Sequence, residues 1–459
     1  MPVSKDFSSF SGLRRCSVAR HLVETWACPV SSSGWPKVQI SNFKVKVFFQ
    51  LIKIALGRQD RFDKVPTTEQ WRDLFREAQR QTLLGVCFSG VERLPADQRP
   101  PREIILQWYS FVNRMEKMNA RMNEMCGKVQ QRFLDDGFRS CILKGQGMAR
   151  YYDRPERRQC GDIDIWVEGG WRKVLQYVYK VRPGGRFVYH HVDFGDVQGI
   201  PVEVHFTPSW MYNPIHNRRL QRWFKEYEEE CFDMEPLSSE HSTFVTPQRD
   251  FDLIFILLHA YRHIFDDGLG LRQLCDYYYL LTEEGRKKME DASSVNSPTS
   301  ESGTSTGSVD ASSAQTMCSH LMMEEGRRKK EDASSVSSLP SVRQPADIDF
   351  RMLGRGFERF ARAVMWIMGE VFGLERTRML IGPSEKHGRF LLHEVMEAGN
   401  FGQEERSRLG LRDGTWKKFF FRQKRNLRFL RSYPSEVLWR TPFIVYHIWW
   451  RLRAKRSLP

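Results

Sequence analysis

The spacing of apolar residues changes twice along the chain. From residue 43 to about 137, apolar positions recur three and four residues apart, as in Trp71, Leu74, Phe75 and Ala78, which predicts helices. Between about 138 and 235 the apolar runs become short and strand-like, with Gly, Pro and Asp between them. Helical spacing then returns. This order predicts an α+β fold, with a small mixed β-sheet flanked by N-terminal and C-terminal helical regions.

Two segments lack any regular spacing of apolar residues. Residues 1–42 have no sustained apolar pattern, and we expect them to be poorly ordered. Residues 283–345 are rich in Ser, Thr, Gly and charge, which is typical of a disordered insertion, and they contain a duplication, EEGRKKMEDASSV and EEGRRKKEDASSV, without an apolar face. The chain is therefore expected to divide into regions 1–42, 43–137, 138–235, 236–282, 283–345 and 346–459.

Charge and cysteine content narrow the class of protein. The net charge is +15, from 71 Lys and Arg against 56 Asp and Glu, so polyanions, nucleotides and anionic membrane surfaces are all suitable partners. Nine cysteines without a CxxC pair indicate free thiols in a reducing compartment. No apolar run approaches the roughly 20 residues that span a bilayer, and the N-terminus lacks a secretory apolar core. We expect a cytoplasmic protein without a transmembrane segment.

Two aspartates stand in an otherwise apolar run, RQCGDIDIWVEGG. Asp162 and Asp164 alternate with isoleucines, so on a strand both carboxylates leave the same face. A buried pair of carboxylates is unfavourable unless cations or protons compensate. Mg²⁺ is commonly bound through one or two carboxylates plus substrate phosphates. The pair alone describes an exposed edge strand equally well.

Neighbouring segments add to the pair. In PVEVHF, Glu203 is flanked by valines and supplies a third carboxylate opposite an apolar face. Upstream, LKGQG ends an apolar strand with Lys144 and Gly145, and Gly147 and Gly161 allow a backbone or a phosphate to approach closely. The order is strand, glycine turn, helix, D-h-D strand and h-E-h strand, where h is apolar.

This order resembles the nucleotidyltransferase superfamily that includes DNA polymerase beta, and within it the uncharacterised bacterial nucleotidyltransferases. LKGQGMARYY, RPERRQCGDIDIWV, VEVHF, LLHAYRHIF and LRQLCDYYYLL look like that group's recurring blocks, over about residues 67–401 without the insertion. The resemblance implies that the sheet is the catalytic core and that a nucleoside monophosphate passes from an NTP such as ATP to an acceptor hydroxyl or phosphate, with release of pyrophosphate. The acceptor, a small molecule, an RNA or a protein, stays open.

The resemblance also assigns roles to residues. It implies that Asp162, Asp164 and Glu203 are catalytic and hold two Mg²⁺ ions, with Mn²⁺ as an alternative. We predict that the nucleotide phosphates lie near Lys144, Gly145, Gly147, Arg158 and Gly161. The superfamily usually has Gly-Gly or Gly-Ser where this chain has LKGQG. Lys144 could supply a charge to a phosphate instead, or the change could mean an altered donor or a lost activity.

Four further residues are candidate substrate contacts. His205 should share a face with Glu203, where it could orient Glu203, touch a substrate or simply be a hydrogen-bonded histidine of the strand. His259 is four residues before His263, but HAYRH lacks the glutamate of a zinc motif, which favours helix packing. Arg272 and Asp276 fall on one helical face. They could form an i,i+4 ion pair with each other, or their side chains could reach into a cleft between domains.

Arginines and aromatic residues leave further alternatives open. Arg154 and Arg157 precede the D-h-D strand, where they could bind phosphate or belong to a solvated basic loop. Residues 412–431 are basic and aromatic, which suits RNA binding, although an amphipathic helix with its Phe, Leu and Trp in the core is favoured. FIVYHIWWRLRAKR, residues 443–456, is compatible with weak docking on a membrane surface, whereas packing on its own domain is commoner. A nucleotide-binding protein without turnover and an RNA-binding protein are the alternative functions.

Overall fold

The computed structural model describes residues 43–239, 242–282, 349–400 and 416–458. The two segments expected to be disordered, 1–42 and 283–345, lie outside this part of the chain, as does the duplication. The N-terminal helices are α2 (Phe43–Ala55), α3 (Thr68–Arg80), α4 (Leu84–Arg93) and α5 (Arg102–Asp135), with a short 3-10 turn, η1 (Ala96–Gln98).

Local sequence explains where α3 begins and which face it buries. Thr67 accepts from the backbone N–H of Gln70, whose side chain accepts from the Thr67 N–H, so two free donors of the first turn are satisfied. The predicted stripe of Trp71, Leu74 and Phe75 is buried. Trp71 packs edge-on against Phe62, with ring centroids 5.5 Å apart.

A four-stranded sheet follows the long helix α5. Its strands are β1 (Ser140–Ile142), β2 (Ile163–Val167), β3 (His191–Val197) and β4 (Ile200–His205), in the spatial order β1-β2-β4-β3. β2 and β4 are parallel, and the outer pairs are antiparallel. Between the strands lie α6 (Lys144–Ala149), η2 (Pro155–Arg157) and α7 (Gly170–Val181). The small mixed sheet confirms the predicted α+β class.

The two faces of the sheet differ in chemistry. Ile163, Ile165, Val202 and Val204 are buried in one apolar cluster with residues of α5 and α7. The other face carries the carboxylates, and near its end Trp166 contacts Phe251, with ring centroids 5.9 Å apart. Alternation along the strands therefore gives one apolar face and one face with ionisable groups.

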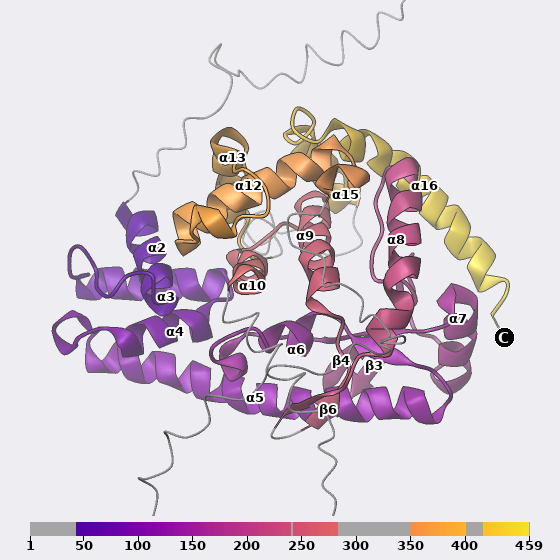
Figure 1. The fold of residues 1–459 in the computed structure, drawn as a ribbon, viewed down its shortest axis with the longest axis horizontal. Coiled ribbons are helices and arrows are strands. Elements are labelled where there is room, and N and C mark those ends of the chain that lie inside the picture. Colours follow the sequence, from indigo (N-terminus) through magenta and orange to yellow (C-terminus); the bar gives the residue numbers. More distant parts are fainter. Residues whose placement is uncertain (1–42, 240–241, 283–348, 401–415, 459) are drawn as a thin grey trace, which may run out of the picture.

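Five helices of the described residues come next after the sheet in the chain. They are α8 (Pro214–Phe232), α9 (Arg249–Phe265), α10 (Leu271–Leu281), α12 (Arg355–Phe372) and α13 (Glu385–Ala398), with the turns η4 (Phe350–Leu353) and η5 (Arg376–Arg378). Of these, α8 and α9 pack on the polar face of the sheet, where Phe224 and Phe251 contact Trp166. A small hairpin, β5 (Leu237–Ser239) with β6 (Ser242–Phe244), precedes α9 in a region expected to be helical. Figure 1 shows α9 in the middle of the molecule, between α8 and α10.

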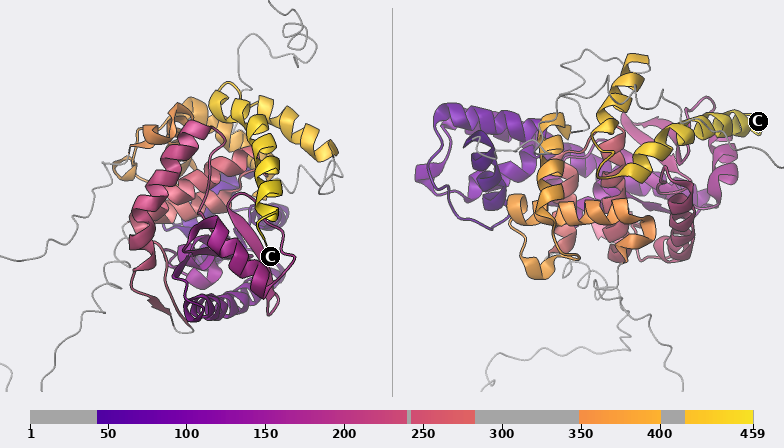
Figure 2. Two further views of the ribbon diagram at one scale, coloured as in Figure 1. Left: turned by 90° about the vertical axis from the view of Figure 1, so that its right-hand side faces the viewer. Right: turned by 90° about the horizontal axis from the view of Figure 1, so that it is seen from above.

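Two C-terminal helices, α15 (Trp416–Leu427) and α16 (Pro434–Lys455), complete the described chain. α16 runs along the outside of the molecule in yellow (Figures 1 and 2). In α15 the expected apolar core is only partly present, because Phe420 is exposed while Arg425 is buried. Arg425 donates to the carbonyls of Ile264 and Asp266 at the end of α9, where such carbonyls lack helical partners. None of the described helices is long and apolar enough to cross a bilayer.

Candidate active site

Strand pairing brings the predicted carboxylates together. Asp162 directly precedes β2, and Asp164 lies within it. On the parallel neighbour β4, Glu203 is opposite Asp164, so both side chains leave the same face. Asp193 on β3, which was not predicted, is opposite Glu203 on its other side. Three adjacent strands therefore present carboxylates in one row.

Asp164 is buried and compensated by other side chains. Its Oδ1 accepts from Lys144 Nζ at 2.8 Å and lies 2.8 Å from His205 Nε2. Burial opposes ionisation, but the Lys144 ammonium and the His205 contact hold the pKa of Asp164 well below its usual range. Burial also disfavours the imidazolium, yet the bond to Asp164 raises the pKa of His205. Asp164 is therefore an anion fixed between two donors.

Asp162 is in the opposite situation. The negative charge of Asp164, followed by burial, raises the pKa of Asp162 to about 6. A divalent cation beside the pair would relieve this repulsion. Asp164, Glu203 and His205 offer ligand atoms that lie within 4.8 Å of one another. Carboxylate oxygens suit both Mg²⁺ and Mn²⁺, so Asp164 and Glu203 fit the expected metals.

Histidines surround Glu203. His191 Nδ1 lies 3.3 Å and His205 Nε2 lies 3.7 Å from Glu203 Oε2. Burial opposes ionisation of Glu203, but His205 and His191 lower its pKa overall. His190 Nε2 contacts His191 Nδ1 at 3.1 Å, and burial holds the pKa of His190 well below its usual value. His205 thus lies between Glu203 and Asp164 and can orient both.

The predicted phosphate-binding glycines occupy two different environments. Gly145 and Gly161 line the cavity described below, and Gly145 has φ +48°, a left-handed conformation that favours glycine. Open space surrounds the position of a Cβ on Gly161. At Gly147, which is buried, a Cβ would lie 2.9 Å from the carbonyl oxygen of Ile142. Gly147 therefore serves the packing of α6 against β1.

Arg158 and Asp276 form one buried ion pair. Arg158 Nε and Nη2 donate to the two Asp276 oxygens at 2.7 and 2.8 Å, and the Tyr152 hydroxyl donates to Asp276 at 2.6 Å. Burial opposes the charge, but Asp276 raises the pKa of Arg158. Both residues also line the cavity. The bidentate pair ties the loop before β2 to α10, so the guanidinium fork is already engaged.

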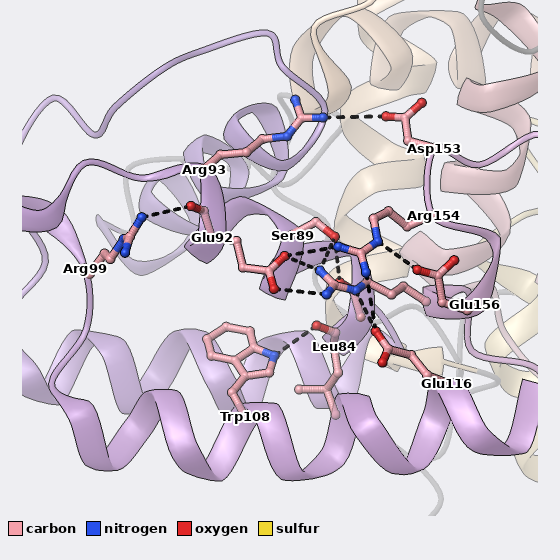
Figure 3. Close-up of polar contacts among 12 residues, drawn as sticks. Leu84, Ser89, Glu92, Arg93, Arg99, Trp108, Glu116, Asp153, Arg154 and Glu156 are labelled. Carbon is pink, nitrogen blue, oxygen red and sulfur yellow. Dashed lines mark hydrogen bonds and ion pairs between the residues drawn. The ribbon is translucent and has the colours of Figure 1, made fainter.

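The two preceding arginines anchor the same loop to the N-terminal helices. Arg157, which is buried, donates to Glu116 Oε1 at 2.9 Å and also pairs with Glu92. Arg154 donates to Glu156 at 2.7 Å and approaches Glu92 and Glu116. Figure 3 shows Arg154 with Glu92 of α4 and Glu116 of α5. Arg157 is buried in these ion pairs and does not fit the alternative of a solvated loop, whereas Arg154 is about half exposed and does fit it.

The carboxylates line a cavity of about 750 Å³, within the size range of small-molecule sites. From the sheet side it is lined by Lys144, Gly145, Arg158, Cys160, Gly161, Asp162, Asp164, His190, His191 and Glu203. The helical side contributes His259, Arg262, His263, Asp266, Asp267, Arg272, Asp276, Arg422 and His447. Residues far apart in the sequence thus enclose one space with both acidic and basic walls.

The predicted contacts on α9 and α10 lie in the helical wall. His259 Nε2 is 2.8 Å from His263 Nε2, and burial lowers the pKa of both residues, so one neutral ring can donate to the other. Arg272 donates to the carbonyl of Gln159 at 3.3 Å. The i,i+4 histidine pair therefore faces the cavity, where the sequence favoured packing between helices.

Sequence reasoning missed two arginines of the helical wall. Arg262 donates to Ser209 Oγ at 3.2 Å and lies over the ring of Trp210. Arg422 on α15 pairs with Asp267. The sequence signal for Arg262 was its position directly before His263, in the HAYRH segment. Nothing local indicated that α15 would reach the cavity, because that contact depends on the packing of distant helices.

Comparisons with known proteins identify a family whose sequences match this chain. Residues 67–305, slightly more than half of the chain, match a family described as uncharacterised nucleotidyltransferase. One solved structure, an antigenic nucleotidyltransferase-like protein from Paracoccidioides brasiliensis, matches at 12% identity and a TM-score of 0.24, over 38% of this chain and 87% of that chain. A superposition this poor supports no argument about fold or chemistry. No curated protein matches the chain.

Proposed function

This chain belongs to the family of uncharacterised nucleotidyltransferases, and on that basis we propose that it transfers a nucleoside monophosphate from an NTP to an acceptor hydroxyl or phosphate. The acceptor oxygen would attack the α-phosphorus, the bond to the bridging oxygen of the β-phosphate would break, and pyrophosphate would leave with the acceptor proton lost to solvent. The observation that carries the proposal is the row of Asp164 and Glu203 in register on β2 and β4, with Asp162 at its edge.

We propose Asp162, Asp164 and Glu203 as the ligands of the metal ions. Two Mg²⁺ ions would supply positive charge to the triphosphate and favour deprotonation of the acceptor. Asp164 is held in its ionised form by Lys144 and His205, and Glu203 by His205 and His191. Because these partners fix the carboxylates before a substrate arrives, little reorganisation is needed on binding.

Lys144 has a second proposed role at the phosphates. Its ammonium already lies 2.8 Å from Asp164, at the start of α6 and in the cavity wall. A triphosphate that enters the cavity would therefore meet Lys144 and the backbone at Gly145, with Arg262 and Arg272 on the opposite wall. The space of about 750 Å³ accommodates a nucleotide.

Pyrophosphate release tests the reaction directly. The full chain would be incubated with Mg²⁺ and each of the four NTPs, together with a low-molecular-weight cell extract, RNA or protein as the acceptor source. We expect one combination to release pyrophosphate, and Asp164→Asn to abolish the release. Asp97→Asn, an exposed aspartate outside the cavity residues, is the matched control and should behave like the wild type. Release that is equal in wild type and Asp164→Asn would contradict the proposal.

A second function, nucleotide binding without turnover, is favoured by one observation. Lys144 and His205 compensate Asp164 within the chain, so the buried carboxylate does not need a metal ion for its stability. Metal-dependent NTP binding with no pyrophosphate release from any acceptor source would support this alternative over catalysis.

A further inference from the structure

Helix α16 uses one face to pack against the rest of the protein. Its buried residues recur at helical spacing and include Phe443, Trp450 and Ala454. Phe443 stacks on Trp210 with ring centroids 6.0 Å apart, and Trp450 contacts Tyr189 at 5.4 Å. The helix is therefore held firmly, and its opposite face has a defined direction.

The opposite face is apolar and exposed. Seven large apolar side chains of α16, within about four turns of the helix, are between 42% and 65% exposed, and contiguous exposed apolar surface of this kind marks interaction sites. Four of them, at positions i, i+7, i+11 and i+14, form one stripe, namely Leu438, Val445, Trp449 and Leu452. Trp439, Tyr446 and Ile448 flank the stripe. We call this set of seven residues the outer face of α16.

Cations accompany the outer face at its C-terminal end. Arg451, Arg453, Lys455 and Arg456 are all exposed, and the Arg453 guanidinium lies 5.6 Å from the ring centroid of Trp449. From residue 437 to the end of the sequence there is no Asp or Glu. The surface thus combines an apolar stripe, aromatic residues with polar tips and a local charge of one sign.

We propose that the outer face of α16 docks on an anionic membrane surface, with the helix lying in the plane of the interface. Aromatic and aliphatic side chains on one face with adjacent Arg and Lys fit the boundary between acyl chains and negatively charged headgroups. A second copy of the chain is a poorer occupant, because its outer face has no carboxylate to complement these cations: no Asp or Glu follows residue 436. The inference does not depend on catalysis.

Flotation with lipid vesicles tests the docking. Full-length protein would be mixed with phosphatidylcholine vesicles, with or without phosphatidylserine, and its distribution measured after density centrifugation. We expect flotation with the serine-containing vesicles and little with phosphatidylcholine alone. Val445→Ser/Trp449→Ser/Leu452→Ser should abolish it. Arg453→Gln/Lys455→Gln/Arg456→Gln should weaken it by roughly fivefold per cation, hence about a hundredfold.

The matched control is a pair of equally exposed apolar residues elsewhere. Leu106 and Tyr109 on α5 are 56% and 50% exposed, and Leu106→Ser/Tyr109→Ser should float like the wild type. Circular dichroism would verify that each variant is folded. Three results would overturn the proposal: no flotation of the wild type, equal flotation with both vesicle types, or flotation that survives the triple serine substitution. Light scattering that shows a dimer dependent on the outer face, without flotation, would assign the face to a second copy.

Discussion

Removal of the Arg158 side chain distinguishes an anchoring residue from a phosphate ligand. In Arg158→Met the Asp276 carboxylate stays buried and loses two donors at 2.7 and 2.8 Å. The partners are only 2% and 5% exposed, so water does not readily replace the lost bonds. Breaking one side of such a pair costs about 3–5 kcal/mol. We expect Arg158→Met to lower the free energy of unfolding by about that amount.

Urea denaturation followed by tryptophan fluorescence would measure this loss. Arg154→Met is the control, because Arg154 is about half exposed and its ion pairs should contribute about 0–1 kcal/mol. Arg158→Met/Asp276→Leu should recover most of the stability, since no unpaired charge remains buried. If Arg158→Met is as stable as Arg154→Met but binds NTP much more weakly, the anchoring interpretation is refuted and Arg158 contacts the nucleotide.

Three further predictions concern packing, pH and charge. Gly147→Ala should destabilise by about 1–3 kcal/mol in thermal unfolding, because its Cβ would lie 2.9 Å from a backbone oxygen, whereas Gly161→Ala should stay within about 0.5 kcal/mol. Burial, aided by Arg262, lowers the pKa of His263 from 6.5 to about 4, so the stability that neutral His263 contributes is full above pH 6.5 and lost as the pH falls toward 4. The loss is at most about 3 kcal/mol. The urea midpoint of the wild type should therefore be lower at pH 4.5 than at pH 7, and His263→Gln should lack this part of the decrease. A wild-type midpoint that is the same at both pH values would contradict the assignment. Lys144→Met should weaken NTP binding about tenfold or more in calorimetry, and equal affinities for Lys144→Met and the exposed control Lys64→Met would exclude a phosphate contact.

Local patterns were sufficient for the faces of the strands. The alternation of Asp162 and Asp164 with isoleucines predicts which side chains share a face, and the structure buries Ile163 and Ile165 against α5 and α7. Helical periods likewise predict the buried stripe of α3. Both patterns are read from residues a few positions apart, so the information lies within the element itself.

Long-range pairing could not be read in the same way. β4 lies between β2 and β3, and only this order places Glu203 beside both Asp164 and Asp193. Arg158 and Asp276 meet although they are 118 positions apart. Their partners depend on how α10 packs against the loop before β2, which no spacing in either segment reveals.

The sequence predicted only part of the surroundings of α16. The sequence favoured packing of this helix on its own domain over contact with a membrane, and the structure packs one face while leaving large side chains exposed on the other. Helical periodicity does not decide between the two, because apolar residues lie on both sides of the helix.

The central claim is that Asp162, Asp164 and Glu203 form a metal-dependent nucleotide site. Isothermal calorimetry of ATP, GTP, CTP and UTP, with and without Mg²⁺, tests it without knowledge of the acceptor. The account predicts that the wild type binds at least one nucleotide only with Mg²⁺, that Asp162→Asn/Asp164→Asn loses this binding, and that Asp97→Asn keeps it. Folded wild-type protein that binds none of the four nucleotides with Mg²⁺, or equal binding by Asp162→Asn/Asp164→Asn, would contradict it.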